Sequence, residues 1–154
     1  MLIYNHSLVK MVFVLEVKYM YDYDSRAKLR NNEFNYEQIM NIIKEVPCYI
    51  ECVENQTEEL QWIAIKGDYW SYQYITNPTP EMTEYCLNQN GHIIQFIDNP
   101  TEEQIKKAIN KNWMSIVHIK KPSLDMCKYA FKISKQSADY IPEDMANIVR
   151  WSCK

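Results

Sequence analysis

Hydrophobic and polar positions recur along this chain with a period of 22 residues from about residue 33 onward. Each period contains an apolar pair, in most units a small residue followed by a larger one, and later two apolar residues three apart. Spacings of three and four place side chains on one face of a helix. The pattern therefore predicts two helices in every unit, the first of about ten residues and the second of about seven. The apolar pairs are Ile42-Ile43, Ala64-Ile65, Cys86-Leu87, Ala108-Ile109 and Ala130-Phe131.

Helix-capping residues mark the start of the first helix in each unit. Such residues accept a hydrogen bond from a backbone N–H of the first turn. An acidic residue follows each cap by two positions, where the helix dipole favours negative charge. Proline directly precedes the last three caps and ends the previous helix, because it excludes helical geometry for the residue before it. The caps are Asn35, Thr57, Thr79, Thr101 and Ser123.

Helices of this length are unstable alone in water, so neighbouring units must pack against one another. We therefore expect an all-α protein, an α-solenoid of about five stacked helical hairpins in a repeat domain of residues 33–154. The stretch "PEDMANIVRWSCK" predicts a further helix that closes the C-terminal end. Residues 1–32 break the register and are expected to form an N-terminal capping segment. Their Val, Tyr and Phe content favours a strand or hairpin there over an atypical helix.

The repeat also resembles a known family. The stretch "EYCLNQNGHIIQFI" combines an acid, a small-large apolar pair, Asn-Gly and spaced aliphatic residues. This pattern is similar to an uncharacterised family of 22-residue tandem helical-hairpin repeats found in large DNA viruses and protists. The resemblance covers about 110 of the 154 residues. It implies the stacked-hairpin fold and a viral origin, with a location in the host cell cytoplasm or the virion, and it supplies no catalytic residues.

A pair of residues four apart recurs on the second helices and is the first candidate site. We name six of these residues the inner ladder: Trp70, Tyr74, His92, Phe96, Met114 and His118. They either pack between neighbouring units or line the inner curve of the solenoid and bind a protein partner, as exposed Trp, Tyr and Met side chains do. If they bind a partner, they should be more exposed than Ile75, Ile97 and Ile119, which are expected to supply core contacts.

Charge is divided unevenly along the chain. Residues 1–100 contain 7 Lys and Arg against 14 Asp and Glu, a net charge of −7, whereas residues 101–154 contain 10 against 6, a net charge of +4. This division allows a solvated outer face, an acidic partner, or self-association between oppositely charged ends. The basic patch consists of Lys106, Lys107, Lys111, Lys128 and Lys132.

No catalytic or cofactor motif is present in the sequence. Cys48 and Cys52 lie four apart, and His92 and His118 occupy the equivalent columns of later units, but burial explains cysteine at such positions better than metal binding does. We therefore assign no metal, cofactor or catalytic residue and expect a protein that is not an enzyme. The absence of an apolar run of about 18 residues indicates no membrane span. Five cysteines without a framework of spacings indicate a reducing, cytoplasmic location.

The leading functional hypothesis is a non-enzymatic scaffold that mediates protein–protein interaction in a viral or host–virus assembly, because repeat stacks present long surfaces. The identity of the protein partner does not follow from the sequence. The alternative is single-stranded RNA binding through the repeat surface and the Lys106–Lys135 region. The net charge of −3 disfavours a nucleic-acid partner.

Overall fold

The computed structural model describes residues 23–152, and all regular structure within that range is helical. Residues 23–30 are helical, and α-helices then alternate with short 3-10 helices. The α-helices are α2 (Tyr36–Glu45), α3 (Glu58–Gly67), α4 (Pro80–Gln89), α5 (Glu102–Lys111), α6 (Leu124–Ile133) and α7 (Glu143–Ser152). The 3-10 helices are η1 (Pro47–Cys52), η2 (Tyr69–Tyr74), η3 (Gly91–Phe96), η4 (Trp113–His118) and η5 (Lys135–Asp139).

The α-helices begin where the capping residues predicted them to begin. The side chain of each predicted cap accepts a hydrogen bond from the backbone N–H three residues later. At Thr101 the cap is reciprocal, because the Gln104 side chain accepts the backbone N–H of Thr101. Asn77 and Asn99 adopt left-handed backbone geometry, with φ of 51°, just before the prolines that end a unit. The prediction of first helices about ten residues long is confirmed.

The second helix of each unit is a 3-10 helix of five or six residues, slightly shorter than the predicted helix of about seven residues. Asp68, Asn90 and Asn112 end one α-helix, and their side chains accept the backbone N–H two residues later, which starts the 3-10 helix. A 3-10 helix superposes side chains three apart. The sequence spacing of three therefore fits both helix types and could not separate them.

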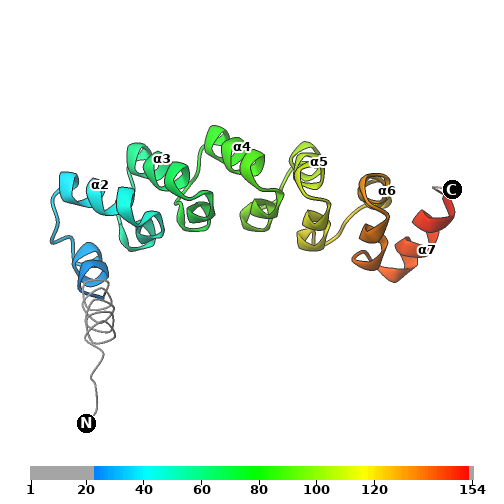
Figure 1. The fold of residues 1–154 in the computed structure, drawn as a ribbon, viewed down its shortest axis with the longest axis horizontal. Coiled ribbons are helices and arrows are strands. Elements are labelled where there is room, and N and C mark those ends of the chain that lie inside the picture. The colour runs from blue at the N-terminus through cyan, green and yellow to red at the C-terminus, as the bar shows by residue number, and fades with distance from the viewer. Residues whose placement is uncertain (1–22, 153–154) are drawn as a thin grey trace, which may run out of the picture.

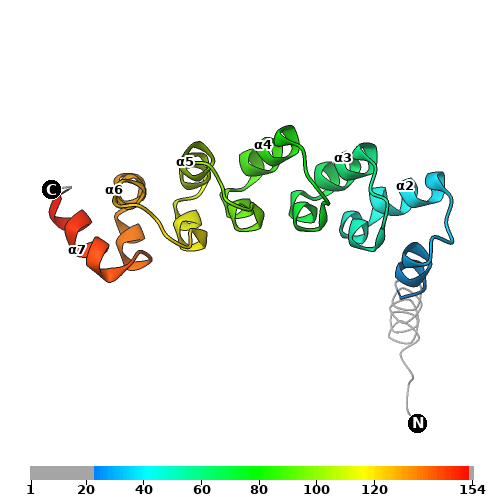
Figure 2. The same cartoon turned by 180° about the vertical axis from the view of Figure 1, so that it is seen from behind.

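The units lie side by side in one row, which Figure 1 shows from the front and Figure 2 from behind. The α-helices follow the convex edge of the row and the 3-10 helices follow the concave edge, which we name the inner surface. Each α-helix contacts the next α-helix, and each 3-10 helix contacts the next 3-10 helix, while units further apart make no comparable contact within the described residues. Within residues 23–152 no helix combines the length and the apolar character needed to cross a lipid bilayer.

The core runs along the row between the two layers of helices. Its central column is the first of the two apolar positions predicted for the second helices, and all its members are buried: Ile50, Tyr72, Ile94, Ile116 and Ala138. The residue directly before the central column is a buried serine in three units: Ser71, Ser115 and Ser137. Their hydroxyl groups have no hydrogen-bond partner within the described residues. The sequence analysis did not identify these serines as core residues, although their small size suits the close packing of 3-10 helices.

The N-terminal segment differs from its expected structure in the part that is described. Residues 23–30 are helical, so the expectation of a strand or hairpin is wrong for them, and residues 1–22 lie outside the described residues. Leu29 is buried in the core, and the Arg26 guanidinium lies 4.9 Å from the centre of the Tyr49 ring on η1. This helix therefore covers the N-terminal end of the row.

Candidate functional site

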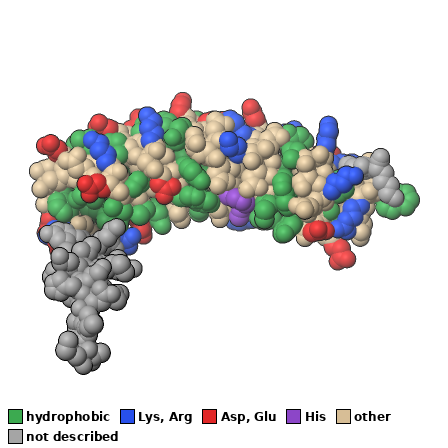
Figure 3. Space-filling model, viewed as in Figure 1, with side chains coloured by type: hydrophobic (Ala, Val, Ile, Leu, Met, Phe, Trp, Pro, Cys, Tyr) green, Lys and Arg blue, Asp and Glu red, His purple; other side chains and the backbone are tan. Residues whose placement is uncertain are grey.

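The 3-10 helices place the inner ladder along the inner surface. Met114 is 37% exposed, and the other five ladder residues are half-buried. Hydrophobic side chains gather along the lower edge of Figure 3, on both sides of the histidines. Ile75 is only 9% exposed, but Ile97 and Ile119 are half-buried like the ladder. The expected difference in exposure is therefore present for Ile75 but absent for Ile97 and Ile119, although all three directly follow the last residue of a 3-10 helix.

Ladder residues touch between units rather than within one helix. The Trp70 and Phe96 rings meet edge to face, with centroids 6.1 Å apart, and the rings of His92 and His118 meet in the same way at 5.0 Å. Both pairs are 26 residues apart in the chain. On an α-helix, the side chains of two residues four apart differ in direction by about 40° around the helix axis, but on a 3-10 helix they differ by about 120°. The two ladder residues of one 3-10 helix therefore point in different directions. The ladder therefore contributes to packing between units while keeping part of its surface in solvent.

A chain of hydrogen bonds joins Asn112, His92 and His118. The Oδ1 atom of Asn112 accepts the backbone N–H of Met114 at 3.1 Å, so Nδ2 is the atom that faces Nε2 of His92, at 2.9 Å. Because this amide nitrogen only donates, Nε2 of His92 accepts and Nδ1 of His92 carries the proton. That Nδ1 lies 2.8 Å from Nε2 of His118, which must also accept. We name this arrangement the histidine relay, and it requires both imidazoles to be neutral.

Acidification is expected to weaken the contact between η3 and η4. Burial lowers the pKa of His118, and the neighbouring His92 lowers that pKa further. Between the ordinary value near 6.5 and the lowered pKa, the unfolded chain holds more protons than the folded chain. Stability should therefore fall as the pH drops through this window and level off below it.

Thermal unfolding across a pH series checks this expectation, with His118→Phe as the control. The residue equivalent to His118 in the preceding unit is Phe96. The variant therefore keeps an aromatic ring at position 118 and removes the imidazole that titrates. The melting temperature of the variant should fall less on acidification than that of the original chain. Equal losses in both proteins would show that the relay does not contribute to the pH dependence.

Val117 and Tyr140 are exposed residues of the inner surface that lie outside the six residues of the inner ladder. Val117 is 43% exposed and Tyr140 is 51% exposed. Val117 follows Met114 by three residues, so both side chains lie on one side of η4. Tyr140 follows η5 in the next unit, and its ring centroid lies 5.7 Å from that of Trp113, the first residue of η4. We name Met114, Val117 and Tyr140 the apolar patch.

An alignment of the units by their 22-residue period shows that Val117 is an unusual residue at its position. At the equivalent position, the other units have only polar or charged residues: Glu51, Gln73, Gln95 and Asp139. All four are exposed. An aliphatic residue in an otherwise polar column is therefore the pattern that could have identified this position before the structure was known.

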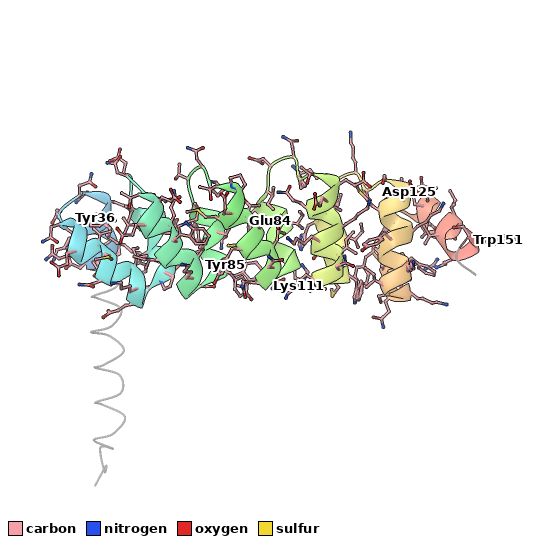
Figure 4. All side chains as sticks on the ribbon, turned by 90° about the horizontal axis from the view of Figure 1, so that it is seen from above. Tyr36, Glu84, Tyr85, Lys111, Asp125 and Trp151 are labelled. Carbon is pink, nitrogen blue, oxygen red and sulfur yellow. The ribbon has the colours of Figure 1, made fainter. Side chains whose placement is uncertain are left out.

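The five lysines of the basic patch do not form one uniform surface. Lys106 makes an ion pair with Glu102 at 2.7 Å, and Lys107 pairs with Glu84 on α4. Figure 4 shows Lys111 at one end of α5 and Asp125 toward the opposite edge, on α6. Lys128 and Lys132 lie together on α6 and make no ion pair within the described residues. Of the three patch lysines without an ion pair in this part of the chain, two therefore lie on α6 and Lys111 lies on α5.

Two of the cysteines, Cys86 and Cys127, are buried in the core. Burial raises the pKa of the Cys86 thiol to about 12, and burial also raises the pKa of Cys127. A thiol with a raised pKa holds little of the reactive thiolate at neutral pH. Within residues 23–152 no three side chains of His, Cys, Asp or Glu lie close enough together to hold a metal ion.

Comparison with known proteins found no match to this chain among protein-family models, curated proteins or solved structures. The inner surface and the uneven charge distribution are therefore the features of the molecule that bear on its function.

Proposed function

We propose that this protein is an α-solenoid scaffold without catalytic activity that binds another protein through its inner surface. The resemblance of its repeat to the viral and protist family leads us to propose a role in a viral or host–virus assembly in the cytoplasm. A row of short units suits this role, because it offers a long surface that several side chains can share.

The observation that carries the proposal is the apolar patch. Met114 and Val117 expose apolar side chains on the same side of η4, although the equivalent of Val117 is polar in every other unit. Contact with a partner would remove this apolar surface from water, which is favourable by about 25 cal/mol per Å². Two half-buried ring side chains of the ladder, His92 and Phe96, lie on the neighbouring 3-10 helix η3. Met and aromatic side chains are enriched in protein interfaces.

The alternative of single-stranded RNA binding has less support. Two of the five lysines in the basic patch are already paired with carboxylates. Trp70 and Phe96 meet edge to face, so these rings are engaged with each other and are not aligned as a platform for successive bases.

Val117→Asp is expected to weaken capture of the protein partner at least about tenfold, or about 1.4 kcal/mol, because it introduces a charge into an apolar contact. Affinity capture from cells of the source organism, followed by titration of the purified partner, measures the loss. Val117 is a better choice than Trp70 or Phe96, because replacing either aromatic residue also removes packing between units.

Gln73→Asp serves as the control, since Gln73 occupies the same exposed column two units away from the patch. It should leave capture nearly unchanged. Capture that is insensitive to Val117→Asp, or the failure to find a specific protein partner, would contradict the proposal.

A further inference from the structure

Helix α6 and the first residue of η5 form a groove that lies outside the inner ladder and the apolar patch. Its volume is about 490 Å³. The residues that line it are Asp125, Lys128, Tyr129, Phe131, Lys132 and Lys135. In Figure 3, Lys and Arg side chains are visible over the C-terminal part of the row, where this groove lies.

Three lysines give the groove its charge. Lys128, Lys132 and Lys135 make no ion pair with any residue in the described range 23–152, and Lys128 is half-buried. The equivalent of Lys128 on α5 is Lys106, which Glu102 neutralises at 2.7 Å. On α6 the single carboxylate in the lining is Asp125, at the start of the helix. The groove therefore has an excess of positive charge with no partner in this part of the chain.

The groove also has an apolar floor held in a fixed position. Phe131 is 8% exposed and belongs to the core. The Tyr129 hydroxyl donates a hydrogen bond to Oδ1 of Asn110 on α5 at 2.8 Å, which orients its ring. A ligand that fits this lining has carboxylate groups for the lysines and an apolar side chain for the two rings.

We propose that this groove binds an acidic peptide segment of a partner protein, with an apolar side chain of that segment packed against Phe131 and Tyr129. The excess of lysines complements the carboxylates, and such complementarity determines specificity and association rate. Nucleic acid fits less well, because the phosphate backbone needs an extended basic track. Here only Lys128, Lys132 and Lys135 supply positive charge to the groove lining, and Lys106 and Lys107 on the neighbouring helix are paired with carboxylates.

Fluorescence anisotropy with the full chain tests this site without knowledge of the natural partner. The probe is a labelled short peptide of Glu and Asp with one central Phe. The variant Lys128→Glu/Lys132→Glu should weaken binding by about tenfold or more. The control Lys106→Glu/Lys66→Glu makes the same charge change at the equivalent positions of other units and should weaken binding much less. Circular dichroism establishes that both variants remain folded.

A second probe in which Gly replaces the Phe should bind more weakly, since it leaves the apolar floor uncovered. Equal losses in the groove variant and its control would overturn the proposal by showing that only overall charge matters. An RNA oligonucleotide that competes as well as the peptide would overturn it in favour of a polyanion site. Salt-sensitive self-association that the groove variant abolishes would overturn it in favour of a second copy of this chain. None of these outcomes depends on the inner surface, so this proposal and the proposed function can fail separately.

Discussion

Ile116→Asp is expected to unfold the row of helices around η4. Ile116 is 1% exposed in the central column of the core, so the new carboxylate would be buried without a partner. Such a burial costs several kcal/mol, against a total stability of about 5–15 kcal/mol for a typical domain. Urea unfolding followed by circular dichroism should show either a much lower midpoint or a chain that is already unfolded without denaturant.

Val117→Asp is the matched control, because it places the same side chain one residue further along the same 3-10 helix, where the native residue is 43% exposed. It should change stability by no more than about 0.5 kcal/mol, as surface substitutions usually do. Ile119→Asp should fall between the two, because Ile119 is half-buried. Similar midpoints for the variants at 116 and 117 would show that the packing of η4 is different from the one described.

Gly91→Ala is expected to destabilise the protein by about 1–3 kcal/mol through overpacking. A Cβ atom at this position would lie 2.2 Å from the backbone oxygen of Ala108 and 2.6 Å from Oγ of Ser115. The Ala108 oxygen cannot move freely, because it accepts the backbone N–H of Asn112 at the end of α5. Helix η3 would therefore have to move away from α5, which a thermal unfolding experiment detects as a lower melting temperature.

Gly67→Ala is the corresponding control at the other glycine of the described chain. Its added Cβ would meet Cγ of Pro47, a side-chain atom, at 2.7 Å, and Gly67 is exposed at the last position of α3. Small movements of the proline ring and the better helix propensity of alanine should leave its stability nearly unchanged. A loss as large as that of Gly91→Ala would mean that the close approach of η3 to α5 is not the cause.

The α-helices could be predicted because their determinants lie within one unit. Thr79 and Thr101 cap helices through contacts three residues away, and the apolar pair Ala108-Ile109 is buried in the same helix. The type of the second helix could not be predicted, since a spacing of three is common to the α and 3-10 forms. The fold class of residues 23–152 therefore followed from the period, whereas the stagger between neighbouring units required coordinates.

The candidate site, like the fold, could be predicted from the sequence only in part. The ladder residues were placed on the second helices correctly, but the contact between His92 and His118 joins two different columns of adjacent units. No spacing within a unit encodes such a contact. The pairing of Lys107 with Glu84 also crosses from one unit to the next, so the sequence overstated the free charge of the basic patch. The α6 groove could be recognised as positively charged only after the structure showed which lysines make ion pairs and which do not.

The junction between units has a consequence for how such a gene can change. Asn77 and Asn99 turn the chain in the same left-handed geometry, each before a proline and a capping threonine, and every unit contacts mainly its neighbours. A tandem duplication of one whole period would therefore recreate both junctions and add one unit to the row. A duplication out of period would misplace a cap and bury a polar column. Recombination in whole periods would therefore change the length of the protein in steps of one unit without changing its fold.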